Sequence, residues 1–470
     1  MKDRYILGLN IYHGDSSACL MKNDEVIFAI EEERINRIKH WAGFPLESIK
    51  ACLNYANIEL GNINHIAINT NPFSNLASKI KYSLSNLQNI KFFLKKLITN
   101  KKKTSFAKIL KNEFKINTVP EIKFYDHHLC HLASSHFPSY FNKSLLISAD
   151  GFGDFTSTCA GLGLNKKISI KHKILFPHSL GIFYQAFTQF LGFKNYGDEY
   201  KVMGLSAYGT DKFKNQVDEV IQYKKQNFYL NLKYFRHHTQ NIGMQWNNQS
   251  PKIDDLYNEN LTKLINIKFK KEISQEHMDL AFSVQKKYEE IILNFIKYYK
   301  DIFQVDFLSL SGGCAMNSLA NGKIIEELGF KNVYIPPSPG DAGGAIGAAI
   351  LCSNDNQSDF KNKNYYYSDQ YLGTKLISNG LLDLIKNKIK QSKTNENINL
   401  DFIEDENKLV DITARNIFEN KVVGWFQGRM EWGPRALGNR SILANPCNHN
   451  MKKIINSKIK EGRVLDHLHH

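Results

Sequence analysis

The sequence predicts an α/β protein made of two similar halves. A mostly apolar stretch at residues 5–12 is typical of a strand, and it runs into the loop His13-Gly14-Asp15-Ser16-Ser17 and a strand–turn–strand pattern. The same succession recurs at residues 145–154, which end in Asp150-Gly151-Phe152-Gly153-Asp154 and lead into a second hairpin. Because each copy places glycine and aspartate at a strand end, we expect two related halves that face one cleft.

Two glycine-rich loops further along the chain support this prediction. A strand at residues 306–310 leads into Ser311-Gly312-Gly313 and a helix, and a strand at 333–335 leads into Asp341-Ala342-Gly343-Gly344 and a helix at 345–351. Glycines between a strand and a helix N-terminus allow backbone N–H groups to approach a phosphate or ribose. Duplicated halves with such loops are the layout of the actin-like fold of ATPases and sugar kinases.

The densest polar motif is His127-His128-Leu129-Cys130-His131. On a helix, His127 and His131 are i, i+4 neighbours, so one metal ion can bind both rings. Asp150 ends a predicted strand and so faces the open end of a sheet, where α/β folds place ligands, and Asp341 supplies another strand-end carboxylate. The alternative is a helix whose histidines cap or line it without a metal, since His128 and His131 are also neighbours at i, i+3.

Other segments are assigned from their periodicity and polarity. We expect helices at residues 45–57, 179–193 and 277–300, a strand at 65–69, and an irregular charged loop at 197–204. Residues 211–275 are polar and give no prediction.

Composition restricts the function and the partners. The formal net charge is +15, but twelve lysines, two glutamates and no arginine lie in residues 79–123, so the excess is local. Lysine without arginine is a poor base-reading surface, so we expect no nucleic-acid partner and interpret residues 76–124 as a lysine-rich insertion that could contact an acidic membrane weakly. The seven cysteines are scattered without a CxxC pair and the first residues lack a secretory leader, which fits a cytoplasmic protein.

A polar stretch at residues 353–370 is the predicted linker to a second domain at 371–470. The dense motif of that domain follows a strand at 421–426 and is QGRMEWGPRALGNRS. Its arginines, glycines and serine form a plausible anion site, because arginine binds phosphate and carboxylate with two parallel hydrogen bonds. A surface loop with scattered arginines is the alternative.

Several ordered motifs resemble the O-carbamoyltransferases that modify nodulation factors and antibiotics such as tobramycin. They are GLNIYHGDSSA, DHHLCHLASSHF, ADGFGD, YGDEYKVMGLSAYG, LSGGCAMN, PPSPGDAGGAIGAA and WFQGRMEWGPRALGNRSILANP, and they span residues 5 to about 446. The resemblance implies an actin-like (duplicated ribonuclease H-like) transfer domain at 1–352, akin to the tRNA threonylcarbamoyl transferase, followed by a YrdC-like domain. In that family the second domain makes carbamoyl-adenylate from ATP and carbamoyl phosphate, and the first transfers the carbamoyl group to a hydroxyl.

The resemblance also implies site residues, matched motif by motif. The metal ligands are His127, His131, Asp150 and Asp341, the general base is His13, and the metal is ferrous iron, with zinc or manganese as alternatives. The remaining matched positions are the carbamoyl-adenylate site of the first domain (Asn10, Gly151, Gly312, Gly313, Asn317) and the site for ATP, with Mg²⁺, and carbamoyl phosphate in the second (Arg429, Arg435, Arg440, Ser441).

The chain departs from the family pattern after this point. The family continues through a K-x-R-E-x-F-R-P-F-A-P-like segment, whereas this sequence reads INSKIKEGRVLDHLHH, so we expect a truncated second domain and doubt that it synthesises carbamoyl-adenylate. The acceptor class is a sugar hydroxyl in a glycan, glycolipid or secondary metabolite. Three alternatives remain: an actin-fold sugar kinase, a tRNA threonylcarbamoyl transferase-like enzyme, and an inactive membrane-surface module.

Overall fold

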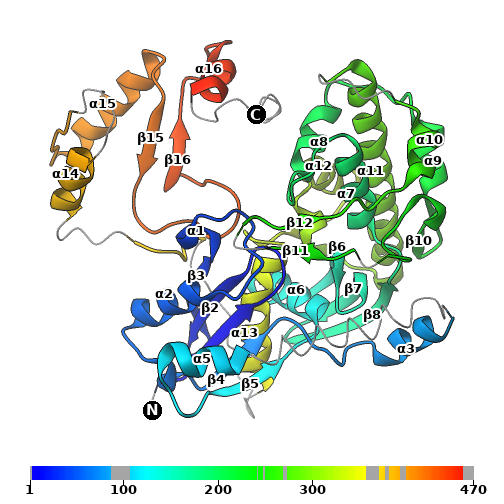
Figure 1. Cartoon of the computed structure of the whole chain (residues 1–470), viewed down its shortest axis with the longest axis horizontal. Helices are drawn as coiled ribbons and strands as arrows, with labels where there is room; N and C mark the ends of the chain where they lie inside the picture. Colours follow the sequence, from blue (N-terminus) through cyan, green and yellow to red (C-terminus); the bar gives the residue numbers. More distant parts are fainter. Residues whose placement is uncertain are drawn as a thin grey trace. The chain divides into compact units, whose positions relative to one another are not determined.

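The computed structural model describes residues 3–85, 106–240, 242–246, 249–267, 273–355, 370–375, 381–391 and 399–458. The chain divides into two compact units, Met1–Ser368 and Asp369–His470. Most of the predicted linker and the central part of the lysine-rich insertion, residues 86–105, lie outside the described residues. Figure 1 shows the elements of each unit, which are taken separately below.

The first unit contains two five-stranded sheets with the same topology. The first sheet has the order β3-β2-β1-β4-β5 and the second has the order β8-β7-β6-β13-β14. In each sheet the first three strands in sequence pair antiparallel with one another. Two later strands then extend the sheet in parallel from the free side of the first strand. The repeated strand–loop–hairpin predicted from the sequence is therefore present in both sheets.

The strands of the first sheet are β1 (Tyr5–Asn10), β2 (Ser17–Lys22), β3 (Glu25–Glu31), β4 (His65–Ile68) and β5 (Glu121–Phe124). The strands of the second are β6 (Lys143–Gly153), β7 (Thr156–Leu164), β8 (Lys167–Leu175), β13 (Phe307–Ser311) and β14 (Asn332–Tyr334). β5 pairs with β4 along its whole length, so the predicted insertion at 76–124 is too long. The last four residues of that range belong to the sheet, because their backbone N–H and C=O groups pair with those of β4 at the sheet edge.

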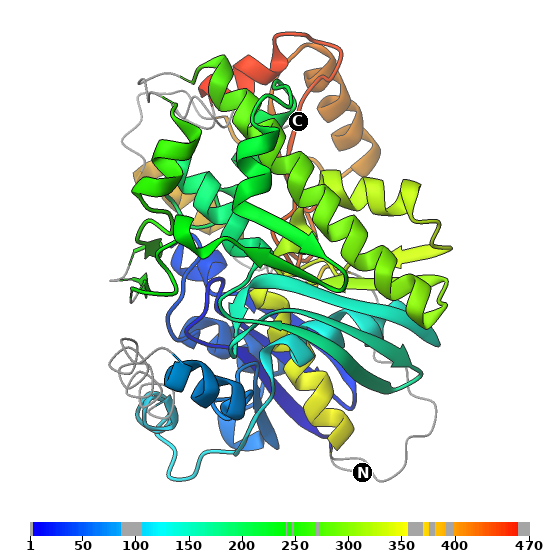
Figure 2. The same ribbon diagram turned by 90° about the vertical axis from the view of Figure 1, so that its right-hand side faces the viewer.

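Two helices form the layers between the sheets and carry much of the site. Helix α13 (Gly344–Asp355) packs on β1 and β4, helix α6 (His127–His136) packs on β6 and β13, and the two helices pack on each other. Figure 2 shows α13, coloured yellow, beside the strands. A Cβ at Gly347 would lie 2.6 Å from the carbonyl carbon of Cys130, so glycine is required for this close helix–helix contact. α13 is apolar on all sides, as expected for a helix buried on every side.

The structure confirms three helices that were predicted from the spacing of apolar residues: α2 (Leu46–Ala56), α7 (Leu180–Phe190) and α11 (Gln275–Phe303). The segment predicted as a charged loop at 197–204 is instead largely the helix α8 (Glu199–Ser206). It packs against α7 and α11 and buries Lys201, Val202 and Met203, so tertiary contacts outweigh its glycine and its charges.

The remaining elements of the first unit are short. The helices are α1 (Glu33–Asn36), α3 (Leu76–Ser85), α5 (Phe106–Phe114), α9 (Lys214–Val220), α10 (Glu259–Ile265) and α12 (Ser318–Glu327). The strand pairs are β9 (Ile221–Lys224) with β10 (Asn227–Leu230), and β11 (Met244–Gln245) with β12 (Lys252–Ile253). Across the described parts of the chain, we find no helix whose length and apolar character would suffice to cross a bilayer.

The described residues of the second unit form one hairpin and three helices. Strands β15 (Val423–Phe426) and β16 (Arg440–Leu443) pair antiparallel with Phe426 opposite Arg440, and the helices are α14 (Leu381–Gln391), α15 (Glu406–Phe418) and α16 (Met451–Lys458). The strand predicted at 421–426 is found two residues shorter. Leu372 and Trp432 are the buried apolar side chains beside the connection between β15 and β16.

Candidate metal centre and its surroundings

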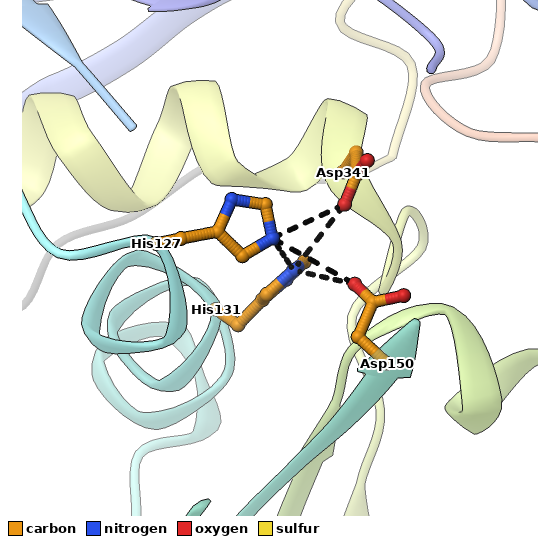
Figure 3. A group of neighbouring side chains, drawn as sticks. All are labelled: His127, His131, Asp150 and Asp341. Atoms are coloured by element: carbon orange, nitrogen blue, oxygen red, sulfur yellow. Dashed lines mark hydrogen bonds and ion pairs between the residues drawn. The ribbon is translucent and has the colours of Figure 1, made fainter. Parts of the chain in front are cut away.

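Helix α6 presents two imidazoles to one point. Its first turn is fixed by Asp126, whose carboxylate accepts the backbone N–H of Leu129, so the helix begins at His127. His127 and His131 are one turn apart, both are buried, and their Nε2 atoms are 3.0 Å from each other. Figure 3 shows the two rings converging between the two aspartates. The i, i+4 spacing has therefore produced the expected geometry.

Asp150 and Asp341 complete the cluster from two other elements. Asp150 lies in β6 where its pairing with β7 is interrupted, and its Oδ2 is 3.0 Å from Nε2 of His131 and 3.7 Å from Nε2 of His127. Asp341 precedes α13, and its Oδ1 is 3.3 Å from Nε2 of His127 and 3.6 Å from Nε2 of His131. We call His127, His131, Asp150 and Asp341 the four-residue cluster. One donor atom from each member lies within 4.8 Å of the others (Figure 3).

The donor spacing fits one divalent ion. Ligands at about 2.0–2.2 Å from a metal lie about 3.0 Å apart at right angles and about 3.4 Å apart in a tetrahedron. Three of the distances within the cluster, 3.0, 3.0 and 3.3 Å, fall in that range, and the other two, 3.6 and 3.7 Å, are slightly longer. Two carboxylates in a largely buried position also require compensating positive charge, which a dication supplies. Imidazole with carboxylate and no thiolate suits iron, zinc or manganese.

The electrostatics of the cluster favour an ionised Asp150. Burial acts to lower the pKa of His127, but hydrogen bonds to Asp150 and Asp341 outweigh it and hold that pKa well above its ordinary value. Burial acts to raise the pKa of Asp150, and the bonds to His127 and His131 hold it well below its ordinary value. A cation at this point, either a proton or a metal ion, is therefore strongly favoured.

His128 has a different role from its two neighbours. Its Nδ1 is 2.6 Å from the Ser148 hydroxyl and its Nε2 is 3.0 Å from the Thr156 carbonyl, so Nε2–H donates and Nδ1 accepts. Burial, together with the nearby His127 and His131, lowers the pKa of His128 to about 3. His128 is therefore a neutral residue that ties α6 to the second sheet, and the i, i+3 alternative does not describe the cluster.

His13 lies beside the four-residue cluster. Its Nδ1 is 3.9 Å from Oδ2 of Asp341, and its ring centroid is 4.9 Å from that of His127. Asn10 fixes the loop of His13, because its buried amide donates to the carbonyls of Gly14 and Asp15 at 2.9 and 3.0 Å. Since both amide hydrogens of Asn10 are used within the loop, we expect it to position His13 rather than to bind nucleotide.

The glycine positions predicted for nucleotide binding surround Asp150. Gly312 has a φ of +87°, and a Cβ there would lie 2.7 Å from the carbonyl carbon of Ala149, so only glycine fits. A Cβ at Gly313 would lie 3.0 Å from Oδ1 of Asp150, whereas Gly151 faces open space. The predicted glycines therefore lie at the same sheet edge as the cluster.

Asn317 lies at the start of α12. Its Oδ1 accepts the backbone N–H of Ala320 at 3.0 Å, and its amide exchanges two hydrogen bonds of 2.9 Å with the Gln285 side chain. These contacts make Asn317 a helix cap.

In the arginine loop of the second unit, residues 427–441, most of the side chains predicted to bind phosphate are instead hydrogen-bonded to groups of the same unit. The guanidinium of Arg440 donates to the carbonyls of Gln427 and Asn439 at 2.6 and 2.8 Å and stacks over the Phe426 ring. Arg429 donates to the Leu372 carbonyl at 2.6 Å and to the Gly373 carbonyl at 3.2 Å. The Ser441 hydroxyl accepts the N–H of Gly438 at 3.0 Å. Arg435, in contrast, is exposed.

Two acidic residues that were not predicted from the sequence stabilise the arginine loop and the start of helix α6. Glu431 is 5% exposed, and its Oε1 accepts the backbone N–H groups of Leu437, Asn439 and Arg440 at 2.9 to 3.0 Å. Asp154 accepts the N–H of His127 at 2.9 Å and the Thr70 hydroxyl at 2.9 Å, which joins α6 to the end of β4. Two features of the sequence could have identified these residues: Glu431 stands among arginines, and Asp154 is the second aspartate of the ADGFGD motif.

Proteins similar to this chain cover almost all of it. An uncharacterized protein (sll1178) of Synechocystis sp. is 34% identical over 474 aligned residues, which cover 97% of this chain and 73% of that protein. Nodulation protein NolNO of Sinorhizobium fredii is 33% identical, with 96% of this chain and 61% of that protein covered. The 3'-hydroxymethylcephem-O-carbamoyltransferase of Streptomyces clavuligerus is 30% identical over 33% of this chain and 26% of that protein. The chain thus spans only part of the length of these relatives.

The similarity to solved structures is distant. HypF of T. kodakarensis has a TM-score of 0.37 at 14% identity, over 74% of this chain and 47% of that one. The activator of 2-hydroxyisocaproyl-CoA dehydratase from Clostridium difficile, with bound ADPNP, has a TM-score of 0.35 at 12% identity, over 84% and 100%. Neither score is high enough to carry an argument.

The family models match both units. The model described as carbamoyltransferase C-terminus matches residues 414–464, within the second unit. The model described as carbamoyltransferase N-terminus matches residues 5–350, which is most of the chain and contains His13 and the whole four-residue cluster. The chain therefore belongs to the carbamoyltransferase family.

Proposed function

We propose that this chain is an O-carbamoyltransferase that moves a carbamoyl group from carbamoyl phosphate, through ATP-derived carbamoyl-adenylate, to a hydroxyl of a sugar-containing acceptor. Membership of the carbamoyltransferase family supports carbamoyl as the group that is transferred. The name of the Streptomyces relative, which modifies a hydroxymethyl compound, supports a hydroxyl acceptor.

The reaction divides between the two units. The first unit is an actin-like, duplicated ribonuclease H-like transfer domain, an assignment that its two sheets of identical strand order support. The second unit is part of a YrdC-like domain that makes carbamoyl-adenylate from Mg²⁺-bound ATP and carbamoyl phosphate. The chain spans 61% of the length of NolNO.

The adenylate is a mixed anhydride that water would hydrolyse, so a protein that both makes and uses it gains by keeping it enclosed. A divalent ion in the four-residue cluster, for which we propose ferrous iron, would polarise the adenylate phosphate as a Lewis acid. The backbone at Gly151, Gly312 and Gly313, beside Asp150, allows close approach of the phosphate and ribose. The N–H groups of Gly151 and Gly312 already donate to Oδ1 of Asp150 and to the Pro339 carbonyl, each at 2.7 Å.

The observation that carries the proposal is His13 beside the cluster. An alcohol is a weak nucleophile at neutral pH, and a histidine next to the reacting carbon can take its proton, a role worth ~10²–10⁴ in rate. Nδ1 of His13 lies 3.9 Å from Oδ2 of Asp341 on a loop fixed by Asn10, so the imidazole would lie beside a ligand bound at the cluster. The proton leaves the acceptor oxygen as that oxygen attacks the carbamoyl carbon.

In the second unit we assign phosphate contact to Arg435. It is the exposed arginine of the loop, and the contacts of Arg429, Arg440 and Ser441 hold the loop that presents it. A guanidinium presented in this way matches the oxyanions of ATP or carbamoyl phosphate.

The test is transfer from supplied carbamoyl-adenylate to a panel of aminoglycosides and N-acetylglucosamine oligomers. His13→Asn should lower the transfer rate by ~10²-fold or more and leave metal content and thermal stability unchanged, because Asn keeps one hydrogen bond but accepts no proton. His172→Asn is the matched control, since His172 bonds Asn227 from β8, away from the cluster.

Two results would contradict the proposal in different ways. Near wild-type transfer by His13→Asn would leave His13 as loop support and the family activity intact. Absence of transfer by the metal-loaded wild-type chain to every acceptor of the panel would remove the proposed function itself.

A further inference from the structure

Tyr196 places a phenol directly against the loop of the proposed base. It lies between α7 and α8, in the half of the first unit that contains the second sheet. A Cβ at Gly14 would lie 2.6 Å from Cζ of Tyr196 and would overlap its hydroxyl, so glycine at position 14 makes room for this ring. Gly14 follows His13 in the chain. The tyrosine hydroxyl is thus a neighbour of the proposed base although it comes from the other half.

The segment that carries Tyr196 is held firmly. Asp198 accepts the backbone N–H and the side-chain amide of Asn195 at 3.2 and 3.1 Å and pairs with Lys201 at 2.9 Å. Gly197 has a φ of +82°, and a Cβ there would lie 2.6 Å from Cε1 of His40. Each half therefore has a glycine that receives an aromatic ring of the other half. This interlock fixes the phenol, and fixed donors stabilise a transition state without reorganising.

The hydroxyl of Tyr196 is a proton donor at neutral pH. Burial raises the pKa of the phenol well above its ordinary value. In the described parts of the chain, no group accepts a hydrogen bond from this hydroxyl, and its side chain is half-buried. The donor is free to meet a ligand.

We infer that Tyr196 is a further catalytic residue, whose hydroxyl donates a hydrogen bond to the carbonyl oxygen of the carbamoyl group during transfer; this rests on the proposed function. In that step the acceptor oxygen bonds to the carbamoyl carbon, the bond from that carbon to the phosphate oxygen breaks, and AMP leaves. The acceptor proton passes to His13. The carbonyl oxygen gains negative charge as the new bond forms, and Tyr196 keeps its proton while stabilising that charge.

The inference is tested with Tyr196→Phe, which keeps the ring that packs on Gly14 and removes only the hydroxyl. With carbamoyl-adenylate supplied, kcat should fall by ~10²-fold while KM for the acceptor changes less than about threefold, because the hydrogen bond strengthens only in the transition state. Metal content and melting temperature should match the wild type. Tyr229→Phe, which removes an exposed hydroxyl in β10, should leave kcat unchanged.

Each other outcome has a separate meaning. If the wild type transfers and Tyr196→Phe does so within about threefold in kcat, the inference is overturned and the proposed function stands. A raised acceptor KM with unchanged kcat would place the hydroxyl on the acceptor instead and also overturn it. Loss of metal or stability in Tyr196→Phe would make the residue structural. A wild type that transfers to no acceptor would remove the proposed function first.

Discussion

The four-residue cluster in the first unit and the arginine loop in the second are both dense in polar side chains, but they use their polar atoms differently. In the cluster, the Nε2 atoms of His127 and His131 and the carboxylates of Asp150 and Asp341 face one another. In the arginine loop, Arg440 donates to carbonyls of its own loop and the Glu431 carboxylate is filled by backbone N–H groups. One arrangement leaves donor atoms for a ligand, and the other stabilises a fold.

The difference shows how a polar motif should be interpreted. A side chain can bind a ligand only with the atoms that the fold has not already paired, because buried donors and acceptors are almost always satisfied. His128 illustrates this within a single helix, since both its ring nitrogens have protein partners while the Nε2 atoms of His127 and His131 converge on the cluster. Arg435 illustrates it in the second unit, where it is exposed beside the internally bonded Arg440.

The largest expected effect tests the cluster side of this comparison. His131→Ala should lose the bound divalent metal, measured by elemental analysis after purification without chelator, and with it transfer activity. Removing a ligand should weaken binding by more than the 10- to 100-fold typical of outer-shell changes. His128→Gln, the matched variant on the same helix, should keep the metal but lose about 1–3 kcal/mol of stability with its buried hydrogen bonds. Equal metal content in both variants would refute the assignment.

A smaller effect is expected in the arginine loop. Arg440→Ala should destabilise the hairpin of β15 and β16 by about 1–2 kcal/mol, because several carbonyls lose their charged donor and the Phe426 ring loses its cation. Arg435→Ala should change stability by less than about 0.5 kcal/mol, as surface substitutions do. Hydrogen–deuterium exchange of the segment 423–443 measures both. Greater exchange in Arg435→Ala than in Arg440→Ala would reverse the roles of the two arginines.

The smallest effect is a pH dependence of the same loop. Burial acts to raise the pKa of Glu431, but hydrogen bonds from the backbone N–H groups of Leu437, Arg440 and Asn439 outweigh it and lower that pKa below 4.5. The carboxylate therefore stabilises the loop above the unfolded-state pKa, and this contribution is lost as pH falls through the folded-state value. Exchange of the 431–441 segment should differ between wild type and Glu431→Gln at about pH 7, and the difference should shrink as the pH falls through the lowered pKa of Glu431. A constant difference would exclude this carboxylate as the cause.

Much of the fold could be predicted from local patterns. The apolar runs of β1, β6 and β13, and the helical periodicity of α2, α7 and α11, predict these elements close to their observed bounds. Segments whose order depends on packing are not predicted in this way. The charged, glycine-containing sequence of α8 favours a loop, yet contacts with α7 and α11 bury its central residues as a helix. Likewise β5 falls within the predicted insertion, because an edge strand is defined by the neighbour that it pairs with.

The sequence by itself determined that His127 and His131 share one face of a helix, because a helix repeats every 3.6 residues whatever surrounds it. It also determined that Asp150 follows an apolar run, which the structure shows to be the first part of β6. Only the tertiary structure decided that Asp341 reaches the same point, since that requires α13 to pack on α6 through Gly347. It alone decided that Arg440 bonds its own loop and that Tyr196 lies on Gly14. Side-chain partners within about 3 Å depend on long-range packing, which no local pattern encodes.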